Sequence, residues 1–400
     1  AEPYAPFVAF MLRGPGRAGT IVHESAADDP EGYTRMPIGS GPFELVDRTP
    51  GESLTLDAYD DYWETDADGN ALPYLDGVDI ELIPEPSTMW SALRGGEIDY
   101  ANLLTGEFAR QGESTDSIRI EKTSSGEWSG MALLCTNPAD HEEDVRWISG
   151  LGEAPTDMWN DQDIPTTDPR VRRAIGMAID REALVERALF GYATAAHTLY
   201  NPAIGWLYDA LGGDEPAAGH YYDPERAAEL LDEAGYTGEP RFEASILALP
   251  ENERELTVIQ QQLSEVGIAV ELDIQQQSSY WDNTYRYQQL ITEYGGAADV
   301  DPWMSDFKQF GYPNEETTEG AWQRSLYFDE EFSELLAEAN ATPELDARAE
   351  VYQRINEHFI EAAPYIPTVY PLNPKAFASG VSGVGIQAGL SNFHRASLNE

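Results

Sequence analysis

"DPRVRRAIGMAIDREALVERALFGYATAA", residues 168–196, is the stretch that most sharply predicts the fold. Asp168 has the side chain of a helix N-cap, and Pro169 suits the first helical position, where no backbone N–H is needed. Asp180 can cap a second helix, which Gly191 would end. Apolar residues recur at helical spacing along the stretch: Val171, Ile175, Ala178 and Ile179. The stretch therefore predicts two consecutive helices.

The same capping pattern returns at 223–235, "DPERAAELLDEAG", with an Asp cap, a Pro, an apolar stripe and a terminal Gly. Farther along the chain, residues 242–248 predict a strand, 253–266 a helix and 268–274 a second strand. A strand, a helix and a strand in that order are typical of a parallel βαβ unit. The middle of the chain is therefore predicted to be α/β.

Toward the N-terminus, residues 41–58, "GPFELVDRTPGESLTLDA", predict a hairpin, because apolar residues alternate and Pro50-Gly51 suits the centre of a type II turn. The other elements expected before residue 136 are a strand at 78–83, a short helix at 86–94, an extended segment at 97–104 and an apolar strand at 128–135.

A polar segment at 137–166 precedes the α/β region. Helices are expected near 329–339 and 344–361, and "YIPTVY" (365–370) predicts a late strand. Strands therefore come first, α/β structure follows, and a strand returns near the end. This order suits two α/β lobes, one inserted into the other.

The chain has 400 residues, which is too long for one ordinary core and indicates two or three domains. It contains no run of 18 apolar residues, so no transmembrane helix is expected. It opens with "AEPYAPF", without Met and without a signal peptide. We therefore expect a processed product or a fragment.

The charge balance is strongly acidic. Asp and Glu number 72 against 24 Lys and Arg, which gives a formal net charge of −48. Such a surface would repel nucleic acid, whose affinity depends on neutralised phosphates, and anionic lipid as well. The aromatic content of 11% and the apolar periodicity oppose a disordered acidic chain. We favour a folded protein of a halophile, since salt screens the repulsion among its surface acids.

Motifs for cofactors and catalysis lack their required context. "GPGRAG" (14–19) fits G-x-G-x-x-G, but no strand–helix unit surrounds it. No G-x-S-x-G elbow or P-loop occurs, and the six histidines are scattered. Cys135 is the one cysteine, so an internal disulfide is impossible, and its apolar run predicts a buried residue. We expect no cofactor and no metal; a Ser/His/Asp triad assembled in space stays open, although no residue points to one.

An acidic segment, "YGGAADVDPW" (294–303), carries Asp299 and Asp301 and admits several interpretations. As a calcium loop it is weak, because Phe310 stands where an EF-hand needs a bidentate Glu. As a capped turn it needs only the tendency of Asp-Pro to turn. Nine aromatic residues between positions 280 and 312 add a third interpretation, in which the segment faces a ligand cleft.

Five segments together resemble the extracellular solute-binding proteins of ABC transporters, family 5 (cluster C), the oligopeptide-, dipeptide- and nickel-binding type. The segment quoted first is the most specific match. The other four are "GSGPFELVDRTPGESLTLDAYDDYWE" (39–64), "SALRGGEIDY" (91–100), "YDPERAAELLDEAGY" (222–236) and "VYQRINEHFIEAAPYIPTVYP" (351–371). They occur in the family's order and cover most of residues 35–385, so chance is a poor explanation.

The resemblance implies an α/β fold of the periplasmic-binding-protein type II (cluster C), with two lobes, a hinge and an interlobe cleft. Residues 1–135 and 367–400 would form lobe I and 136–366 lobe II, with crossings near 135 and 366. Family members begin with an export signal, a first strand and an extra subdomain, whereas the match here starts inside that plan. The resemblance thus implies an N-terminally truncated chain with an incomplete lobe I.

The resemblance also implies a function. The protein would capture a peptide or similar solute between its lobes, close around it and deliver it to the permease subunits of an ABC importer, without covalent chemistry. It would be an extracellular, cell-surface monomer, held at the membrane only through a missing N-terminal anchor, as a lipoprotein is. The Asp-Pro-Arg helix would be structural, with Arg170, Arg172 and Arg173 paired to surface acids.

Site residues follow from the resemblance, residue by residue. In peptide-binding relatives an aspartate after a Gly-rich stretch pairs with the ligand's ammonium group, and both Asp299 and Asp301 match that place. A carboxylate in a dry cleft makes a strong charge-assisted hydrogen bond with an ammonium. The remaining candidates are aromatic residues of the cleft and glycines that let backbone approach the ligand: Tyr280, Trp281, Trp303, Gly295 and Gly296.

Three rivals stay open. An oligosaccharide would suit the same fold, because nine Trp are available to stack on sugar faces. Nickel or a nickel chelate is weaker, since the histidines are scattered. A secreted hydrolase, a different class of protein, is opposed by the absence of a nucleophile motif in its context.

The charge yields a prediction about salt. At low ionic strength repulsion among the acids is unscreened, so the protein should lose stability or unfold, and molar salt should restore it. The melting temperature measured in dilute buffer and in molar NaCl checks this. An unchanged melting temperature would show that the acids do not require screening.

Overall fold

The computed structural model describes residues 22–102, 104–124, 126–149, 157–216, 218–297, 308–312, 323–387 and 390–398. Their contacts divide the chain into two compact units. Unit 1 contains the described residues of Gly126–Pro371, and unit 2 those before Gly126 and from Leu372 onward. The contacts divide the chain at 126 and 371, and the lobe crossings expected near 135 and 366 stay a prediction. The identity of the two units as hinged lobes stays a prediction as well.

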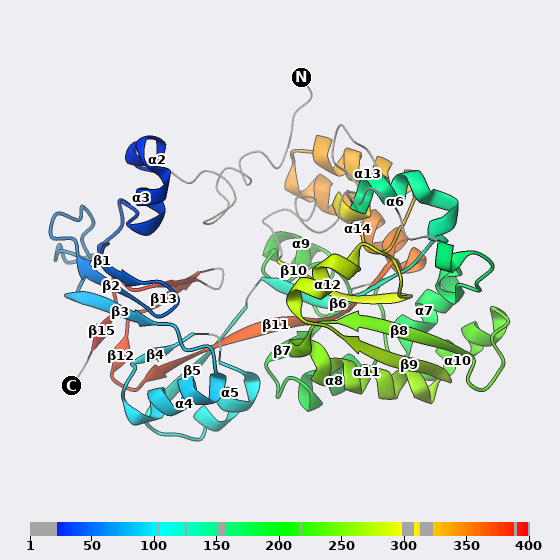
Figure 1. Cartoon of the computed structure of the whole chain (residues 1–400), viewed down its shortest axis with the longest axis horizontal. Helices are drawn as coiled ribbons and strands as arrows, with labels where there is room; N and C mark the ends of the chain where they lie inside the picture. The colour runs from blue at the N-terminus through cyan, green and yellow to red at the C-terminus, as the bar shows by residue number, and fades with distance from the viewer. Residues whose placement is uncertain are drawn as a thin grey trace. The chain divides into compact units, whose positions relative to one another are not determined.

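Unit 1 is built on a mixed sheet (Figure 1). Its strands are β6 (Glu127–Leu133), β7 (Ala193–Ala195), β8 (Phe242–Ala248), β9 (Ile268–Ile274), β10 (Ile291–Ala297) and the first half of β11 (Tyr365–Ala378). The order is β11–β6–β10–β8–β9, with β7 beside β11. β8 runs parallel to β9 and β10, whereas β6 is antiparallel to β10 and β11.

Helices cover both faces of this sheet. They are α6 (Glu142–Ser149), α7 (Pro169–Met177), α8 (Arg181–Arg187), α9 (Gly205–Ala210), α10 (Pro224–Glu233), α11 (Glu253–Glu265), α12 (Gln277–Thr284), α13 (Glu330–Ala341) and α14 (Leu345–Ala362), with short 3₁₀ turns η1 (Pro138–His141), η2 (Asp157–Trp159), η3 (Pro165–Thr167), η4 (Pro250–Asn252) and η6 (Lys308–Phe310). α8 and α11 lie on one side of the sheet and α13 and α14 on the other (Figure 1).

Alternation along β6 explains the two layers, because successive strand residues point to opposite faces. Met131 and Leu133 belong to the core beneath α7, α8, α10 and α11. Trp128 and Ala132 belong to the core beneath α9, α13 and α14. Cys135, predicted to be buried, is partly buried against this second core.

The predicted βαβ unit is confirmed. β8 and β9 pair in parallel over seven positions, from Phe242 opposite Ile268 to Ala248 opposite Ile274, and α11 connects them. Ile246 and Ile268 are fully buried, as expected for strands covered on both faces.

The Asp caps predicted from the sequence are confirmed. The carboxylate of Asp168 accepts a hydrogen bond from the Arg170 backbone N–H at 2.8 Å and opens α7. Asp180 and Asp223 cap α8 and α10 in the same manner, each at 2.9 Å. Each cap satisfies a backbone N–H that the first helical turn leaves without a partner. An Asp cap therefore fixes where these helices begin, and in α7 and α10 a Pro follows it.

The expectation that Arg172 pairs with surface acids is wrong. Its side chain is buried, and it donates to three backbone carbonyls, those of Ala362, Thr166 and Thr167, at 2.7, 2.7 and 3.0 Å. Arg170 does pair with an acid, its own helix cap Asp168. The two arginines differ because Arg172 lies on the buried face of α7, where helix-end carbonyls need donors.

Unit 2 contains short elements around the second half of β11. They are helices α2 (Ser25–Asp28), α3 (Pro30–Arg35), α4 (Pro86–Gly95) and α5 (Gly106–Gly112), and strands β1 (Phe43–Thr49), β2 (Ser53–Ala58), β3 (Gly77–Glu81), β4 (Tyr100–Ala101), β5 (Ile118–Ser124), β12 (Val381–Ser382), β13 (Gly385–Gln387), β14 (Leu390–Asn392) and β15 (Ser397–Leu398). The extension predicted at 97–104 is thus limited to β4. A small core joins α4, α5, β4 and β5 to Ala376 of β11.

The predicted hairpin is confirmed in unit 2. β1 and β2 are antiparallel, and Gly51 has a φ of 78°, as the second central position of a type II turn requires. β3 extends this pair to a three-stranded sheet. Every residue of the three strands keeps part of its surface exposed, including Ile80 at 41%.

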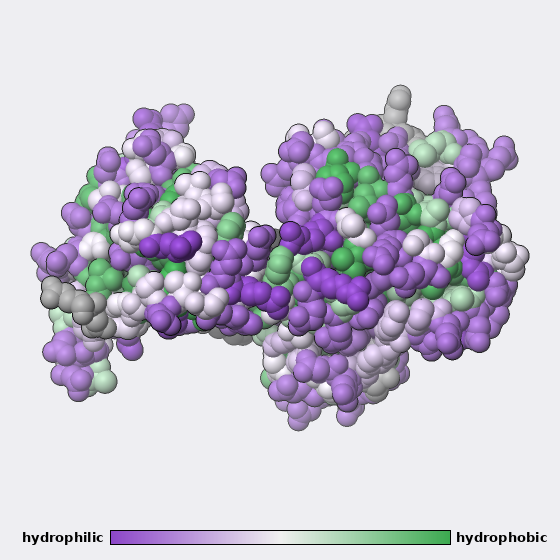
Figure 2. Space-filling view, turned by 90° about the horizontal axis from the view of Figure 1, so that it is seen from below, coloured by the Kyte–Doolittle hydropathy of each residue, from purple (hydrophilic) through white to green (hydrophobic). Residues whose placement is uncertain are grey.

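The surface agrees with the acidic composition. Figure 2 shows hydrophilic residues over most of one face of each unit, with hydrophobic residues visible between them. Many acids of α11, α13 and α14 are exposed, among them Glu265, Glu338 and Glu350. The acids are therefore spread over surface helices, as expected from their distribution along the chain.

Arg172 supplies a prediction about stability. Arg172→Leu keeps much of the bulk but removes the donor to three backbone carbonyls, that of buried Thr166 among them, so unfolding should become easier by about 2–4 kcal/mol. Urea unfolding followed by circular dichroism measures this. Arg173→Leu, at the half-buried neighbouring position, is the matched control and should cost less than about 0.5 kcal/mol. Equal losses would mean that the carbonyl contacts are unimportant.

Candidate functional site

The carboxyl edge of the parallel strands in unit 1 is the candidate site. β8, β9 and β10 all end at this edge because they are mutually parallel. In open α/β sheets, ligands bind outside the carboxyl ends of the strands. α12 follows β9 and carries Tyr280 and Trp281, while β10 carries Gly295 and Gly296 near its end. Four sequence-predicted residues therefore come from elements of one edge.

Tyr280 and Trp281 are neighbours with different environments. Tyr280 is 1% exposed, and its hydroxyl donates to the backbone carbonyl of Glu293 on β10 at 2.5 Å. Trp281 is 43% exposed, and its ring meets that of Tyr280 edge-on at 5.2 Å. Tyr280 thus anchors α12 to β10, and Trp281 presents an aromatic surface to solvent.

The two glycines of β10 have a packing explanation. A Cβ atom on Gly295 would lie 2.8 Å from the carbonyl oxygen of Trp128, and one on Gly296 would lie 2.6 Å from the Trp128 ring. Trp128 is 1% exposed and belongs to β6, which pairs with β10. Packing against Trp128 is therefore a sufficient reason for a glycine at both positions. Contact of these glycines with a ligand stays a prediction.

A second tyrosine, on strand β11, also fixes the position of β10 through a hydrogen bond. The hydroxyl of Tyr365, on β11, donates to the backbone carbonyl of Tyr294. The Tyr365 ring reaches it across Gly130 of β6, where a Cβ atom would come within 2.7 Å of the hydroxyl oxygen. Trp128 packs edge-on against both tyrosines, at 5.3 and 5.0 Å. Aromatic residues of three strands thus fix the end of β10.

Arg324 was not anticipated from the sequence. Its guanidinium carbon lies 3.4 Å from the ring centre of Tyr294, 5.1 Å from that of Tyr285 and 5.6 Å from that of Trp281. It donates to the Tyr285 hydroxyl at 2.9 Å and to Gln309 Oε1 at 3.4 Å. The aromatic density at 280–312 was visible in the sequence, but nothing marked an arginine beyond that segment as its cationic centre.

Two buried acids lie beside this edge. Burial raises the pKa of Glu293 to about 8, with further elevation from Glu255 and Glu251 and opposition from the Asn252 amide and Arg324. Burial also raises the pKa of Glu255, opposed by a hydrogen bond of 2.7 Å from the Thr368 hydroxyl. Glu293 is therefore largely protonated at neutral pH and can donate a hydrogen bond.

Asp299, Asp301 and Trp303 lie outside the described residues. They follow the last residue of β10, Ala297, in the chain. Their place in the site therefore rests on the sequence resemblance and on the position of β10.

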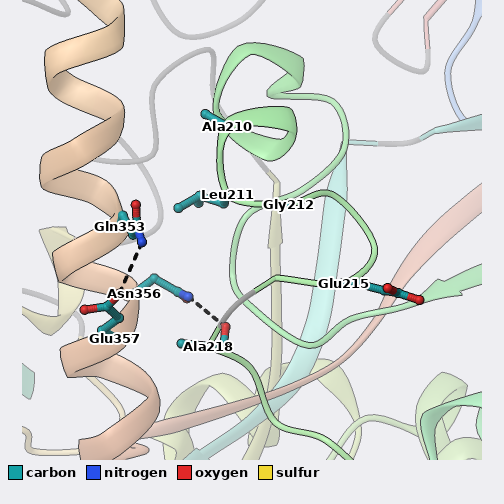
Figure 3. Close-up of a pocket in the computed structure, with 8 residues that line it drawn as sticks. All are labelled: Ala210, Leu211, Gly212, Glu215, Ala218, Gln353, Asn356 and Glu357. Carbon is teal, nitrogen blue, oxygen red and sulfur yellow. Dashed lines mark hydrogen bonds between the residues drawn. The ribbon is translucent and has the colours of Figure 1, made fainter.

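A cavity of about 270 Å³ lies elsewhere in unit 1 (Figure 3). It opens between α14 and the loop after α9, and Asn356 on α14 donates to the carbonyl of Ala218 across it at 2.8 Å. The other lining residues are Ala210, Leu211, Gly212, Glu215, Gln353 and Glu357. None of the sequence-predicted residues lines this cavity.

The described part of the chain contains neither a metal-binding cluster nor a membrane-spanning helix. Within it, no group of three His, Cys, Asp or Glu side chains is arranged to hold a metal ion. No helix there has the length and apolar character to cross a membrane.

Solved structures with the same fold come from periplasmic binding proteins. DppA of Helicobacter pylori, solved in complex with the peptide STSA, has a TM-score of 0.73 and 25% identity, covering 100% of this chain and 71% of that one. NikZ of Campylobacter jejuni, in complex with Ni(L-His), has a TM-score of 0.70 and 18% identity, with 98% and 73% covered. The fold is therefore that of the type II periplasmic binding proteins.

The model of the family described as "Bacterial extracellular solute-binding proteins, family 5 Middle" matches residues 1–317. The chain belongs to this family of solute-binding proteins. The resemblance seen in the sequence motifs is thereby confirmed.

Curated relatives carry several ligand names. The oligopeptide-binding protein AppA of Bacillus subtilis (strain 168) is 24% identical over 364 residues, which are 87% of this chain and 59% of AppA. The nickel-binding periplasmic protein of Escherichia coli (strain K12) is 25% identical over 352 residues, 84% of this chain and 60% of that protein. The chain thus spans about three fifths of the length of these relatives.

Glu293 gives a prediction about pH. Because its pKa is raised when folded, the native state keeps a proton that the unfolded chain releases above its ordinary pKa of 4.5. Stability should therefore fall as pH rises from about 4.5 to about 8. Glu293→Gln removes this fall, so the variant should be the more stable protein at pH 9 and about equal to wild type at pH 4.

Melting temperatures of both proteins across pH 4–9 test this. Glu243→Gln, at an exposed position on β8, is the control and should follow the wild-type curve. Parallel curves for wild type and Glu293→Gln would contradict the buried, protonated carboxyl group.

Proposed function

We propose that this protein is the extracellular substrate-binding component of an ABC importer that captures a peptide or a similar amine-bearing solute. Family membership over residues 1–317 is the observation that carries the proposal. The fold supports it, because ligands bind at the carboxyl edge of open α/β sheets and aromatic side chains often line such sites, as exposed Trp281 could here. The protein binds its ligand and catalyses no reaction.

In this proposal the segment after β10 supplies the anionic anchor. Tyr280, Tyr365 and Trp128 fix the end of β10, so the backbone entering residues 298–301 starts from a defined place. Asp299 or Asp301 then pairs with the ligand's ammonium group, Trp281 and Trp303 contact other parts of the ligand, and Gly295 and Gly296 keep the backbone accessible to it. Tyr280 supports this surface from behind.

The partners and location complete the proposal. Two hinged lobes, with crossings near 135 and 366, close on the solute, and the closed form docks on permease subunits. The protein works as a monomer at the cell surface, anchored as a lipoprotein, and its acidic surface suits a salt-rich exterior. Among the relatives, names and titles include peptide, glutathione, heme and nickel ligands, which supports a peptide or a similar small solute.

The amine anchor is tested with matched peptides in molar salt. A thermal-shift screen should show stabilisation by short peptides with a free amine, since a bound ligand stabilises by RT ln(1 + [L]/Kd). Asp299→Ala or Asp301→Ala should weaken binding of the free-amine peptide roughly tenfold or more, because a charge-assisted hydrogen bond is lost.

N-acetylated versions of the same peptides are the control and should bind both variants about as weakly as they bind wild type. Equal losses for free and acetylated peptides would count against the anchor. Stabilisation by oligosaccharides or nickel chelates alone would replace the peptide with another solute, and turnover of any ligand would favour an enzyme.

A further inference from the structure

One cation lies behind the exposed aromatic surface of the candidate site. The Arg324 side chain is 6% exposed and is enclosed by the rings of Tyr294, Tyr285 and Trp281. Trp281 is 43% exposed, so much of its indole faces solvent while another part faces the guanidinium. The rings belong to β10, to α12 and to the residue that ends α12. The arrangement therefore joins the site's elements around one buried positive charge.

A cation next to an aromatic ring changes what the rest of that ring can bind. The ring quadrupole attracts a positive charge to its face, and Arg324 already occupies this interaction. A second cation stacked on Trp281 would also be repelled by the guanidinium through a low-dielectric interior, where screening by salt is weak. An anion or a neutral planar group would meet the opposite effect, because its negative or π-rich atoms are attracted by the same charge.

We infer that Trp281, backed by Arg324, takes the anionic or neutral planar part of the ligand, a carboxylate or an amide plane, and rejects a cationic group. The inference rests on the proposed function, in which Trp281 contacts the ligand. It gives the ligand a direction, because the ammonium group must lie away from Trp281. Trp281 and Arg324 are then specificity-determining and positioning residues respectively.

The overall charge makes this position distinctive. The chain carries a formal charge of −48, so its general field attracts cations and repels anions. Salt at molar strength shortens the range of that field to about 3 Å, so only nearby charges act on a ligand group. A local preference for anions at Trp281 is therefore opposite in sign to the average surface and is measurable against it.

Charged quenchers of fluorescence test the inference without a ligand. Iodide and caesium quench exposed tryptophans, and the difference between wild type and Trp281→Phe isolates Trp281 from the other eight tryptophans. At equal, molar ionic strength, with the quenching by each ion divided by its quenching of free N-acetyltryptophanamide, we expect iodide to quench Trp281 at least twofold more strongly than caesium. Arg324→Met should abolish this preference for iodide, and Arg324→Lys, which keeps the charge, should preserve it.

A matched control removes a charge elsewhere. Arg254, exposed on α11, stacks on Phe190 at 4.7 Å, so Arg254→Met changes the net charge equally without touching Trp281. It should leave the iodide preference intact. Stronger quenching by caesium than by iodide in the wild-type protein would overturn the inference whatever the variants do.

A ligand arm separates this inference from the proposed function. The probe is a free-amine tetrapeptide with either a C-terminal carboxylate or a C-terminal amide, and a version with a C-terminal agmatine that places a cation there. Wild type should bind the acid and the amide at least tenfold more tightly than the agmatine form, and Arg324→Met should reduce this ratio to about one. Equal binding of all three forms by wild type overturns the inference alone, and no binding of any form overturns the proposed function with it.

Discussion

The crossing of Tyr365 over Gly130 is the constraint on which the centre of unit 1 depends. β6 has β10 on one edge and β11 on the other, and the Tyr365 side chain connects the outer two strands by passing over the middle one. A side chain at Gly130 would collide with the carbonyl oxygen of Ile366 at 2.2 Å and with the Tyr365 ring. Trp128 then fills the space beside this crossing and presses on the glycines of β10. The end of β10 is therefore positioned by packing across three strands.

Local sequence features predicted the local structure well. An Asp followed by Pro specifies a helix start through its own backbone, and a Pro-Gly pair specifies a turn, so both follow from adjacent residues. The βαβ unit was equally accessible because its periodicities extend over whole elements. These elements, together with the family motifs, were sufficient for the fold class.

The site was less predictable because burial depends on residues distant in the chain. Tyr280 and Trp281 are adjacent aromatic residues that the sequence does not separate. The Tyr280 hydroxyl donates to the backbone carbonyl of Glu293 and the residue is buried, whereas Trp281 is exposed. The glycines of β10 were interpreted as room for ligand, whereas Trp128, more than 160 residues earlier, already requires them. Arg172 and Arg324 carry no local signal that separates them from surface arginines. The chain has few cations, yet Arg172 donates to backbone carbonyls and Arg324 contacts aromatic rings.

Strand β11 has a consequence for the order in which the protein can fold during synthesis. Its first residues complete the sheet of unit 1, and Leu372–Ala378 pair with β5 in unit 2. All residues of unit 1 from Gly126 on have been made once Pro371 leaves the ribosome, whereas β5, made about 250 residues before its partner, must wait with an unpaired edge. Pairings between such distant segments form slowly, and waiting strand edges invite aggregation. Unit 1 can therefore be complete while unit 2 is still open, and a binding chaperone would be of most use to the segment that ends at β5.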